Sequence, residues 1–176
     1  MSNHLEDLVA EWLEYNGYFV RKSVLVGPRP NGGFEGELDV VAVHPATKHL
    51  LHVECSLDAH PWPKREERFT SKFARGRKYV GALLSGFEFD GEADQVAILQ
   101  MADNHSHVGG GRIVSVADFV SEVLLRLSTK SPIKMAVPST FPLLRTMQLA
   151  AQPQKRGLTG RALLGSRPTM NVGAGV

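Results

Sequence analysis

Two carboxylates interrupt segments whose other residues favour a β-strand. Asp39 lies within residues 37–43 (Glu-Leu-Asp-Val-Val-Ala-Val), and Glu54 lies within residues 50–56 (Leu-Leu-His-Val-Glu-Cys-Ser). Residues 44–48 between them are typical of a turn, so we predict an antiparallel hairpin. Carboxylates inside a covered sheet are costly unless they pair with cations or bind metal. We therefore expect Asp39 and Glu54 to converge and to hold Mg²⁺ (or Mn²⁺), for which oxygen ligands are suited.

Strand alternation decides which side chains accompany these acids. It places Glu37 on the face of Asp39, and His52 and Ser56 on the face of Glu54. The alternative is that both acids are exposed at strand ends or pair with Arg and Lys. For two acids on adjacent strands, we favour the metal site over this alternative.

The rest of the chain supplies the elements that would position the two strands. An apolar repeat predicts an amphipathic helix from residue 5 to residue 13, ended by Gly17, and Ser115 is a typical cap for a second amphipathic helix. Further segments predict strands at 18–26, 95–101 and 112–114 and helices at 64–80 and 141–151. The order predicts an α/β fold with a mixed sheet flanked by helices.

A helix followed by Gly-Glu-Leu-Asp-Val-Val-Ala (36–42) and His-Val-Glu-Cys-Ser (52–56) resembles the PD-(D/E)XK nuclease superfamily. The nearest likenesses are type IV restriction endonucleases, archaeal Holliday-junction resolvases and nuclease domains of CRISPR ancillary proteins, over residues 3–127. The resemblance implies a restriction endonuclease-like αβββαβ core. It also implies that Asp39 and Glu54 are metal ligands and that the backbone carbonyl of Cys55 is a further ligand.

Glu6, on the predicted first helix, matches an acidic residue that many of these families place near the metal. An alternative reading gives Glu6 a structural role, because Asn3 followed three residues later by Glu6 also resembles a capping box. The sequence leaves both readings open.

One departure from the family motif concerns catalysis. The motif ends in lysine, but Ser56 stands there, and a serine cannot stabilise charge on a phosphate. Lys72 on the following helix is our candidate for a relocated lysine, because it borders the apolar face that contains Phe73. The other possibilities are activation of water by the metal alone and an inactive site.

Basic residues recur along the same helix. At helical spacing, Lys72 and its neighbours would form a basic stripe beside the predicted site, as expected for contact with a polyanion; a solvated helix face is the competing interpretation. The predicted nucleic-acid-binding residues are Lys64, Arg65, Arg68, Arg75 and Lys78.

The charge distribution divides the chain in two. Residues 1–122 contain all 18 acidic residues and 12 of the 20 Lys and Arg residues, whereas residues 123–176 contain no acidic residue. We predict a nuclease-like domain at 1–130 and a basic C-terminal extension or tail at 131–176, which could bind phosphate or a protein partner. Neither a secretory signal nor an apolar stretch long enough for a bilayer is found, and the single cysteine cannot form an internal disulfide, so we expect a cytoplasmic protein.

These patterns predict a metal-dependent nuclease or nuclease-like protein acting on DNA or RNA phosphodiesters, with DNA favoured. The alternative is a catalytically inactive nuclease-fold subunit that serves nucleic-acid binding or protein assembly. No membrane partner is expected. The sequence leaves open whether the chain forms a homodimer.

Overall fold

Residues 4–102 and 104–152 are described by the computed structural model, and along them helices and strands follow in the order α1, β1, β2, β3, α2, β4, β5, β6, α3, α4. Their bounds are α1 His4–Tyr15, β1 Phe19–Pro28, β2 Phe34–His44, β3 His49–Ser56, α2 Trp62–Leu83, β4 Asp94–Leu99, β5 His107–Val108, β6 Gly111–Ser115, α3 Val116–Ser128 and α4 Pro142–Ala150. The described part of the chain is thus an α/β fold in which a mixed sheet of six strands is flanked by four helices.

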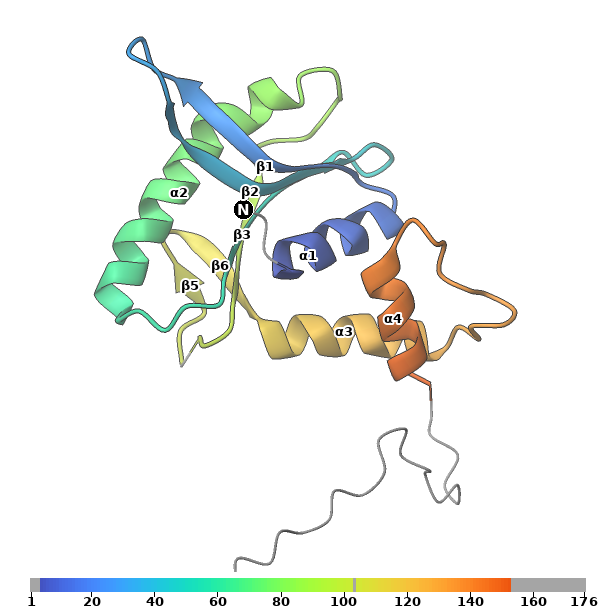
Figure 1. Ribbon diagram of the computed structural model, residues 1–176. Coiled ribbons are helices and arrows are strands. Elements are labelled where there is room, and N and C mark those ends of the chain that lie inside the picture. Colours follow the sequence, from blue (N-terminus) through green and yellow to red (C-terminus); the bar gives the residue numbers. More distant parts are fainter. Residues whose placement is uncertain (1–3, 103, 153–176) are drawn as a thin grey trace, which may run out of the picture.

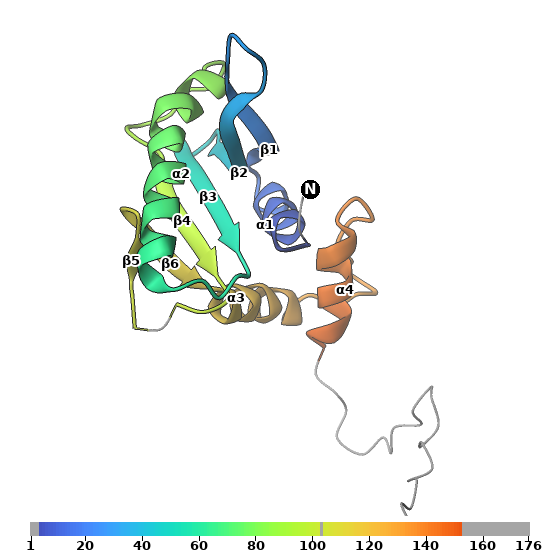
Figure 2. The ribbon, with the colours of Figure 1, turned by 60° about the vertical axis from the view of Figure 1, so that its left-hand side comes forward.

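The sheet has the strand order β1-β2-β3-β4-β6-β5. The pairs β1–β2, β2–β3 and β5–β6 are antiparallel, whereas β3–β4 and β4–β6 are parallel. Strand β3 therefore lies where the antiparallel and parallel parts meet. Figures 1 and 2 show α2 across one face of the sheet and α1, α3 and α4 on the other side.

Alternate residues of the central strands enter two separate cores. Val40 and Val53 belong to the core under α1 and α3, whereas Val41 belongs to the core under α2. The face of the sheet that carries Asp39 and Glu54 is consequently the α2 face, because each lies an even number of residues from a side chain on that face. The predicted alternation is confirmed along β3, whereas on β2 it is interrupted before Val40, because Leu38, next to Asp39, also packs in the core under α2.

Local signals at two helix ends act as the sequence predicts. Gly17 has a φ of 90°, a conformation that glycine adopts without a Cβ clash, and it lies two residues after the last residue of α1. The Ser115 side chain accepts a hydrogen bond of 2.9 Å from the amide of Asp118 and so caps α3. Asn3, the predicted cap of the first helix, lies outside the described residues.

The core continues past the boundary predicted at residue 130. Val137 and Leu144 are buried in the same core as Val9. The Glu11 carboxylate accepts hydrogen bonds from the first-turn amides of α4 at Leu143 (3.3 Å) and Leu144 (3.0 Å). The part of the predicted extension up to α4 therefore packs on the domain, and its remainder, 153–176, lies outside the described residues.

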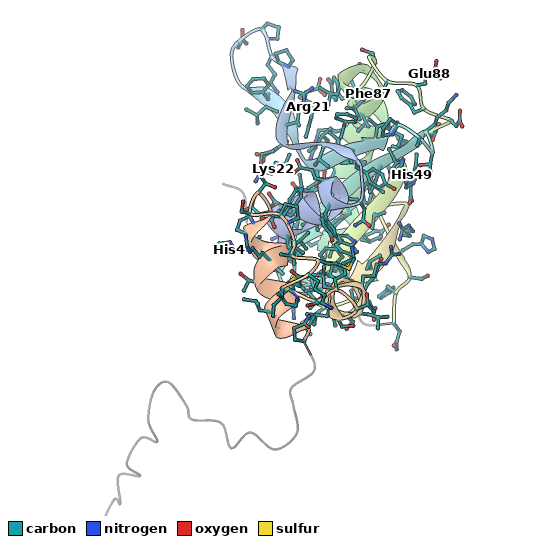
Figure 3. The ribbon with its side chains drawn as sticks, turned by 90° about the vertical axis from the view of Figure 1, so that its right-hand side faces the viewer. His4, Arg21, Lys22, His49, Phe87 and Glu88 are labelled. Atoms are coloured by element: carbon teal, nitrogen blue, oxygen red, sulfur yellow. The ribbon has the colours of Figure 1, made fainter. Side chains whose placement is uncertain are left out.

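The edge strand β1 is tied to elements on both sides of the sheet. Figure 3 shows Lys22 beside α1, where it pairs with Asp7. Arg21 lies near Phe87, and its guanidinium donates to the carbonyl of Leu83 at 3.4 Å. In the described residues, no helix is both long and apolar enough to cross a membrane.

Helix α2 approaches the sheet closely at Gly76. A Cβ added there would lie 2.1 Å from Nδ1 of His52, which is completely buried on β3. By contrast, a Cβ at Gly81, five residues along the same helix, would make only ordinary contact with Phe89 at 3.7 Å. The closeness of α2 to β3 thus depends on the missing side chain at Gly76.

The two glycines provide a matched test of this packing. We expect Gly76→Ala to lower the free energy of unfolding by about 1–3 kcal/mol, because the methyl group forces α2 and His52 apart. Gly81→Ala should raise it by about 0.5–1 kcal/mol, through helix propensity alone. Urea unfolding measures both, and equal effects of the two substitutions would contradict the proposed contact.

Candidate active site

Asp39 and Glu54 meet where β2 and β3 stop pairing. The last paired residues in this direction are Val40 and Val53, so the two acids follow directly beyond them. Instead of a ladder bond to β2, the amide of Cys55 donates to Oδ2 of Asp39 at 2.8 Å. The carboxylate thereby satisfies a backbone donor that the end of the ladder leaves without a strand partner.

Lys72 reaches this pair from α2. Its ammonium donates to both carboxylate oxygens of Asp39, at 3.0 and 3.1 Å, and also to Oε2 of Glu54. The side chain of Asp39 is 10% exposed, that of Glu54 is 0% exposed and that of Lys72 is 18% exposed. We call these three residues the carboxylate–lysine cluster. The sequence prediction that Lys72 lies beside the two acids is therefore matched by the geometry.

The position of Lys72 follows from the helix it occupies. The neighbouring Phe73 is completely buried and packs with Phe69 under α2. Lys72 precedes it by one residue, at the border of the buried face, so its aliphatic stem can lie along the core while its ammonium reaches the sheet.

His52 supports Glu54 from two residues away on the same strand. Its Nε2 lies 2.8 Å from Oε1 of Glu54, and because a carboxylate only accepts, Nε2 carries the proton. The ring packs edge-on against Phe73, with 5.5 Å between ring centroids. Glu54 is thus held between a histidine and a lysine, and we interpret His52 as a positioning residue.

Burial and charge shift the three pKa values in different directions. Burial and the nearby charge of Glu54 raise the pKa of Asp39 to about 7, against the opposing effect of Lys72. Burial also acts to raise the pKa of Glu54, but the hydrogen bond from His52 and the charge of Lys72 outweigh it and lower that pKa. Burial disfavours the charged form of Lys72, yet the two carboxylates raise its pKa. Without a further cation, Asp39 is therefore the acid that protonates first.

Ser56, which stands where the family motif has lysine, is part of a polar network at the end of β3. Its hydroxyl donates to Asp58 at 2.6 Å and accepts from Nη2 of Arg68 at 2.8 Å. Asp58 was not singled out from the sequence. The signal that could have found it is its position two residues after Ser56, just before a helix rich in arginine.

Arg65 corrects one expectation about the basic stripe. Its side chain is only 5% exposed, and its guanidinium donates to the carbonyls of Met101 and, at 2.6 Å, of Asp58. It therefore holds two loops together and is not available to a nucleic acid.

The other predicted nucleic-acid-binding residues lie on the outer side of α2 or at its border. Lys64 is exposed, Arg75 donates to Ser71, and Lys78 pairs with Glu35 at 2.9 Å. A shallow groove of about 380 Å³ lies between α2 and the β1–β2 hairpin. Its lining residues are Arg29, Glu35, Ser71, Ala74, Arg75 and Lys78.

The remaining predicted site residues lie around the cluster at different depths. Glu37 is partly exposed on β2, and Glu6 is buried on α1. The Cys55 thiol enters the core on the α1 side, and its pKa is raised by burial and by the charges of Asp39, Glu6 and Glu54, so the thiol stays protonated. Glu6 therefore acts electrostatically on the strand that carries Glu54, from the opposite side of the sheet.

No group of three or more His, Cys, Asp or Glu side chains within 4–102 and 104–152 is arranged to hold a metal ion. The cation between Asp39 and Glu54 in this structure is the ammonium of Lys72. Comparison with known proteins gave no match: no protein-family model, no curated protein and no solved structure is significantly similar to this chain.

The raised pKa of Asp39 predicts how stability depends on pH in metal-free buffer. The folded protein holds a proton on Asp39 that the unfolded chain releases near pH 3.8, so stability falls as pH rises from there through about 7. The slope from one such proton is at most about 1.4 kcal/mol per pH unit. The pKa of Glu54 is lowered from its ordinary 4.5 and that of Lys72 is raised from its ordinary 10.5, so neither group changes its charge between roughly pH 5 and pH 8.

Asp39→Asn removes this proton and should flatten the dependence. Urea unfolding with EDTA at several values from roughly pH 5 to pH 8 compares the slopes of the two proteins, and histidine contributions cancel in the difference. Equal slopes in the wild type and in Asp39→Asn would show that Asp39 is already ionised in the folded protein.

Proposed function

We propose that this protein is a metal-dependent nuclease of the PD-(D/E)XK type, with a restriction endonuclease-like core, that hydrolyses phosphodiesters of DNA. The observation that carries this proposal is the contact of Lys72 with both Asp39 and Glu54. It supplies, from α2, the lysine that the sequence lacks at position 56. The element order α1-β1-β2-β3-α2-β4 agrees with the order expected for such a core.

The donor set suits a hard divalent cation. Asp39 and Glu54 offer carboxylate oxygens side by side, and the peptide of Cys55 lies within hydrogen-bonding distance of Asp39. Mg²⁺ is commonly bound through one or two carboxylates, with water and substrate phosphate completing its shell, so a third protein carboxylate is not required. Asp39, Glu54 and the Cys55 carbonyl would hold Mg²⁺ or Mn²⁺, which would supply charge stabilisation and an activated water.

Three residues of this chain then have distinct roles. Glu54 is kept ionised by His52 and Lys72, which preserves a ligand charge although the side chain is completely buried. Lys72 provides a positive charge that can neutralise the oxygens of a phosphate as negative charge develops on them. Its ammonium is fixed by two carboxylates and so needs little reorganisation.

The polyanion would run along the border of α2. Arg68, Lys72 and Arg75 follow one another at helical spacing on this border and are all partly exposed. The groove beside Arg75 and Lys78 continues the path towards the β1–β2 hairpin. Lysines and arginines in such a row attract a phosphate backbone without reading its sequence.

A second function is favoured by one observation. Lys72 compensates one carboxylate charge, and Asp39 takes up a proton with a pKa of about 7, so the cluster does not require a metal. A protein with this arrangement could bind nucleic acid or assemble with a partner without cutting. In that case the purified protein binds nucleic acid in a salt-sensitive way, with and without divalent cations, and leaves it intact.

Cleavage assays with matched variants separate the two functions. We expect the protein to cut labelled single- or double-stranded DNA with Mn²⁺ and to leave it intact with EDTA, and we expect Asp39→Ala to abolish cutting. Lys72→Ala should slow cutting by about 100-fold or more, because a charge acting on the transition state is lost. Lys134→Ala, an exposed lysine on the α3–α4 loop, is the control and should cut like the wild type.

The outcomes are distinct. Cutting that survives Asp39→Ala would assign the activity to another site or a contaminant. Salt-sensitive binding without metal-dependent cutting would establish the second function. If the protein neither cuts nor binds DNA or RNA, the proposed function is wrong.

A further inference from the structure

The turn after β3 is held by Asp58. Its carboxylate accepts from the Ser56 hydroxyl at 2.6 Å and from the amide of His60 at 3.3 Å. Burial acts to raise the pKa of Asp58, but the hydrogen bonds from Ser56 and Arg68 outweigh it and lower the pKa to about 2. Asp58 is therefore an anion at physiological pH, two residues along the chain from Ser56.

Two arginines of α2 converge on this one anion. Nε of Arg65 lies 3.7 Å from Oδ1 of Asp58, and Nη1 of Arg68 lies 2.5 Å from Oδ2. One carboxylate between two guanidinium groups leaves one positive charge without compensation inside the network. Because Arg65 is buried and bonded to two backbone carbonyls, the excess charge is presented by Arg68.

Arg68 keeps donors that the network does not use. A guanidinium has five N–H donors, whereas the contacts of Arg68 engage one N–H towards Asp58 and one towards Ser56. Its Nε is buried without a hydrogen-bond partner among the described residues, so the donors left for a ligand are the remaining hydrogens on Nη1 and Nη2, on a side chain that is 35% exposed. The guanidinium is thus fixed on one side and open on the other.

The location of this guanidinium relates it to the carboxylate–lysine cluster. Arg68 precedes Lys72 by four residues on α2, and its contact Ser56 follows Glu54 by two residues on β3. Residues with these spacings lie on the same side of a helix and on the same face of a strand. Arg68 and Lys72 therefore present neighbouring positive groups along one line.

We propose that Arg68 anchors a phosphate group of the polynucleotide next to the carboxylate–lysine cluster, and that Asp58 is the positioning residue that fixes its guanidinium. This inference rests on the proposed function and names the chemical group that the site holds. A planar guanidinium held by a carboxylate keeps a fixed orientation, and its remaining Nη hydrogens can still donate to a phosphate oxygen, whereas an ammonium on a flexible stem is not fixed in this way. Arg65, by contrast, stabilises the loops.

Binding without catalysis is the first test. Fluorescence anisotropy with a labelled single-stranded DNA oligonucleotide, in EDTA and at several salt concentrations, measures affinity for the wild type, Arg68→Ala, Arg68→Lys and Asp58→Asn. We expect Arg68→Ala to weaken binding about tenfold or more and to reduce the salt slope by about one ion. Arg68→Lys should recover the salt slope but only part of the affinity.

The matched control is Arg77→Ala. Arg77 lies on the same helix, is exposed, and donates to Gln95 at 2.7 Å, away from Ser56 and Asp58. This variant should bind like the wild type. Asp58→Asn should weaken binding only while Arg68 is present, so the double variant should bind no more weakly than Arg68→Ala.

A chemical change in the ligand tests the contact itself. Oligonucleotides carrying one neutral methylphosphonate at successive positions remove one phosphate charge at a time. At one position the substitution should weaken binding to the wild type by the same factor as Arg68→Ala, and it should have no further effect on Arg68→Ala. A purely structural role for Arg68 would not produce this loss of sensitivity at a single phosphate.

The results separate this inference from the function on which it rests. If the wild type binds in a salt-sensitive way and Arg68→Ala binds equally well, the inference is wrong and the proposed function stands. If Arg68→Ala loses affinity but stays sensitive to the methylphosphonate at every position, Arg68 is structural and the inference is again overturned. If the wild type neither binds nor cuts, both fail.

Discussion

The structure depends on the compensation of two carboxylates buried beside each other in the sheet. Asp39 and Glu54 leave water almost completely, so each would destabilise the fold if the other were its only charged neighbour. Lys72 offsets part of this cost and Asp39 retains a proton up to a pKa of about 7, and Lys72 can act on both acids only because α2 crosses the sheet beside them. The close approach at Gly76 and the packing of Phe73 serve the same placement. The need to place a positive charge beside both acids thus links the position of α2 to the positions of β2 and β3.

Much of this arrangement could be predicted because it follows from local rules. The alternation along β2 and β3 assigned the acids to one face, and the spacing of apolar residues placed Lys72 at the border of its helix. Turn residues and the Ser115 cap located the ends of elements. Strand β2 begins three residues before the predicted segment, and the two-residue β5 was not predicted, since short pairings depend on a partner more than on composition.

What could not be predicted depends on contacts between distant residues. The burial of Arg65 follows from carbonyls at Asp58 and Met101, which no spacing in the sequence brings together. The roles of Ser56 and Asp58 likewise emerge only when α2 lies over the end of β3. The packing of residues 131–150 was missed because the apolar side chains that matter, such as Val137 and Leu144, fit a core formed mainly by other elements.

The seam between α1 and α4 has a consequence for synthesis on the ribosome. The Glu11 carboxylate accepts its hydrogen bonds from the amides of Leu143 and Leu144, and Val9 shares a core with Leu144. An early part of the chain therefore makes its contacts with a part that is synthesised much later. While the intervening residues emerge, α1 and α3 carry an apolar surface without its final cover. All six strands are synthesised before α4, so this seam can close only after they have emerged, as a long-range contact whose loop entropy is set by more than a hundred residues between the partners.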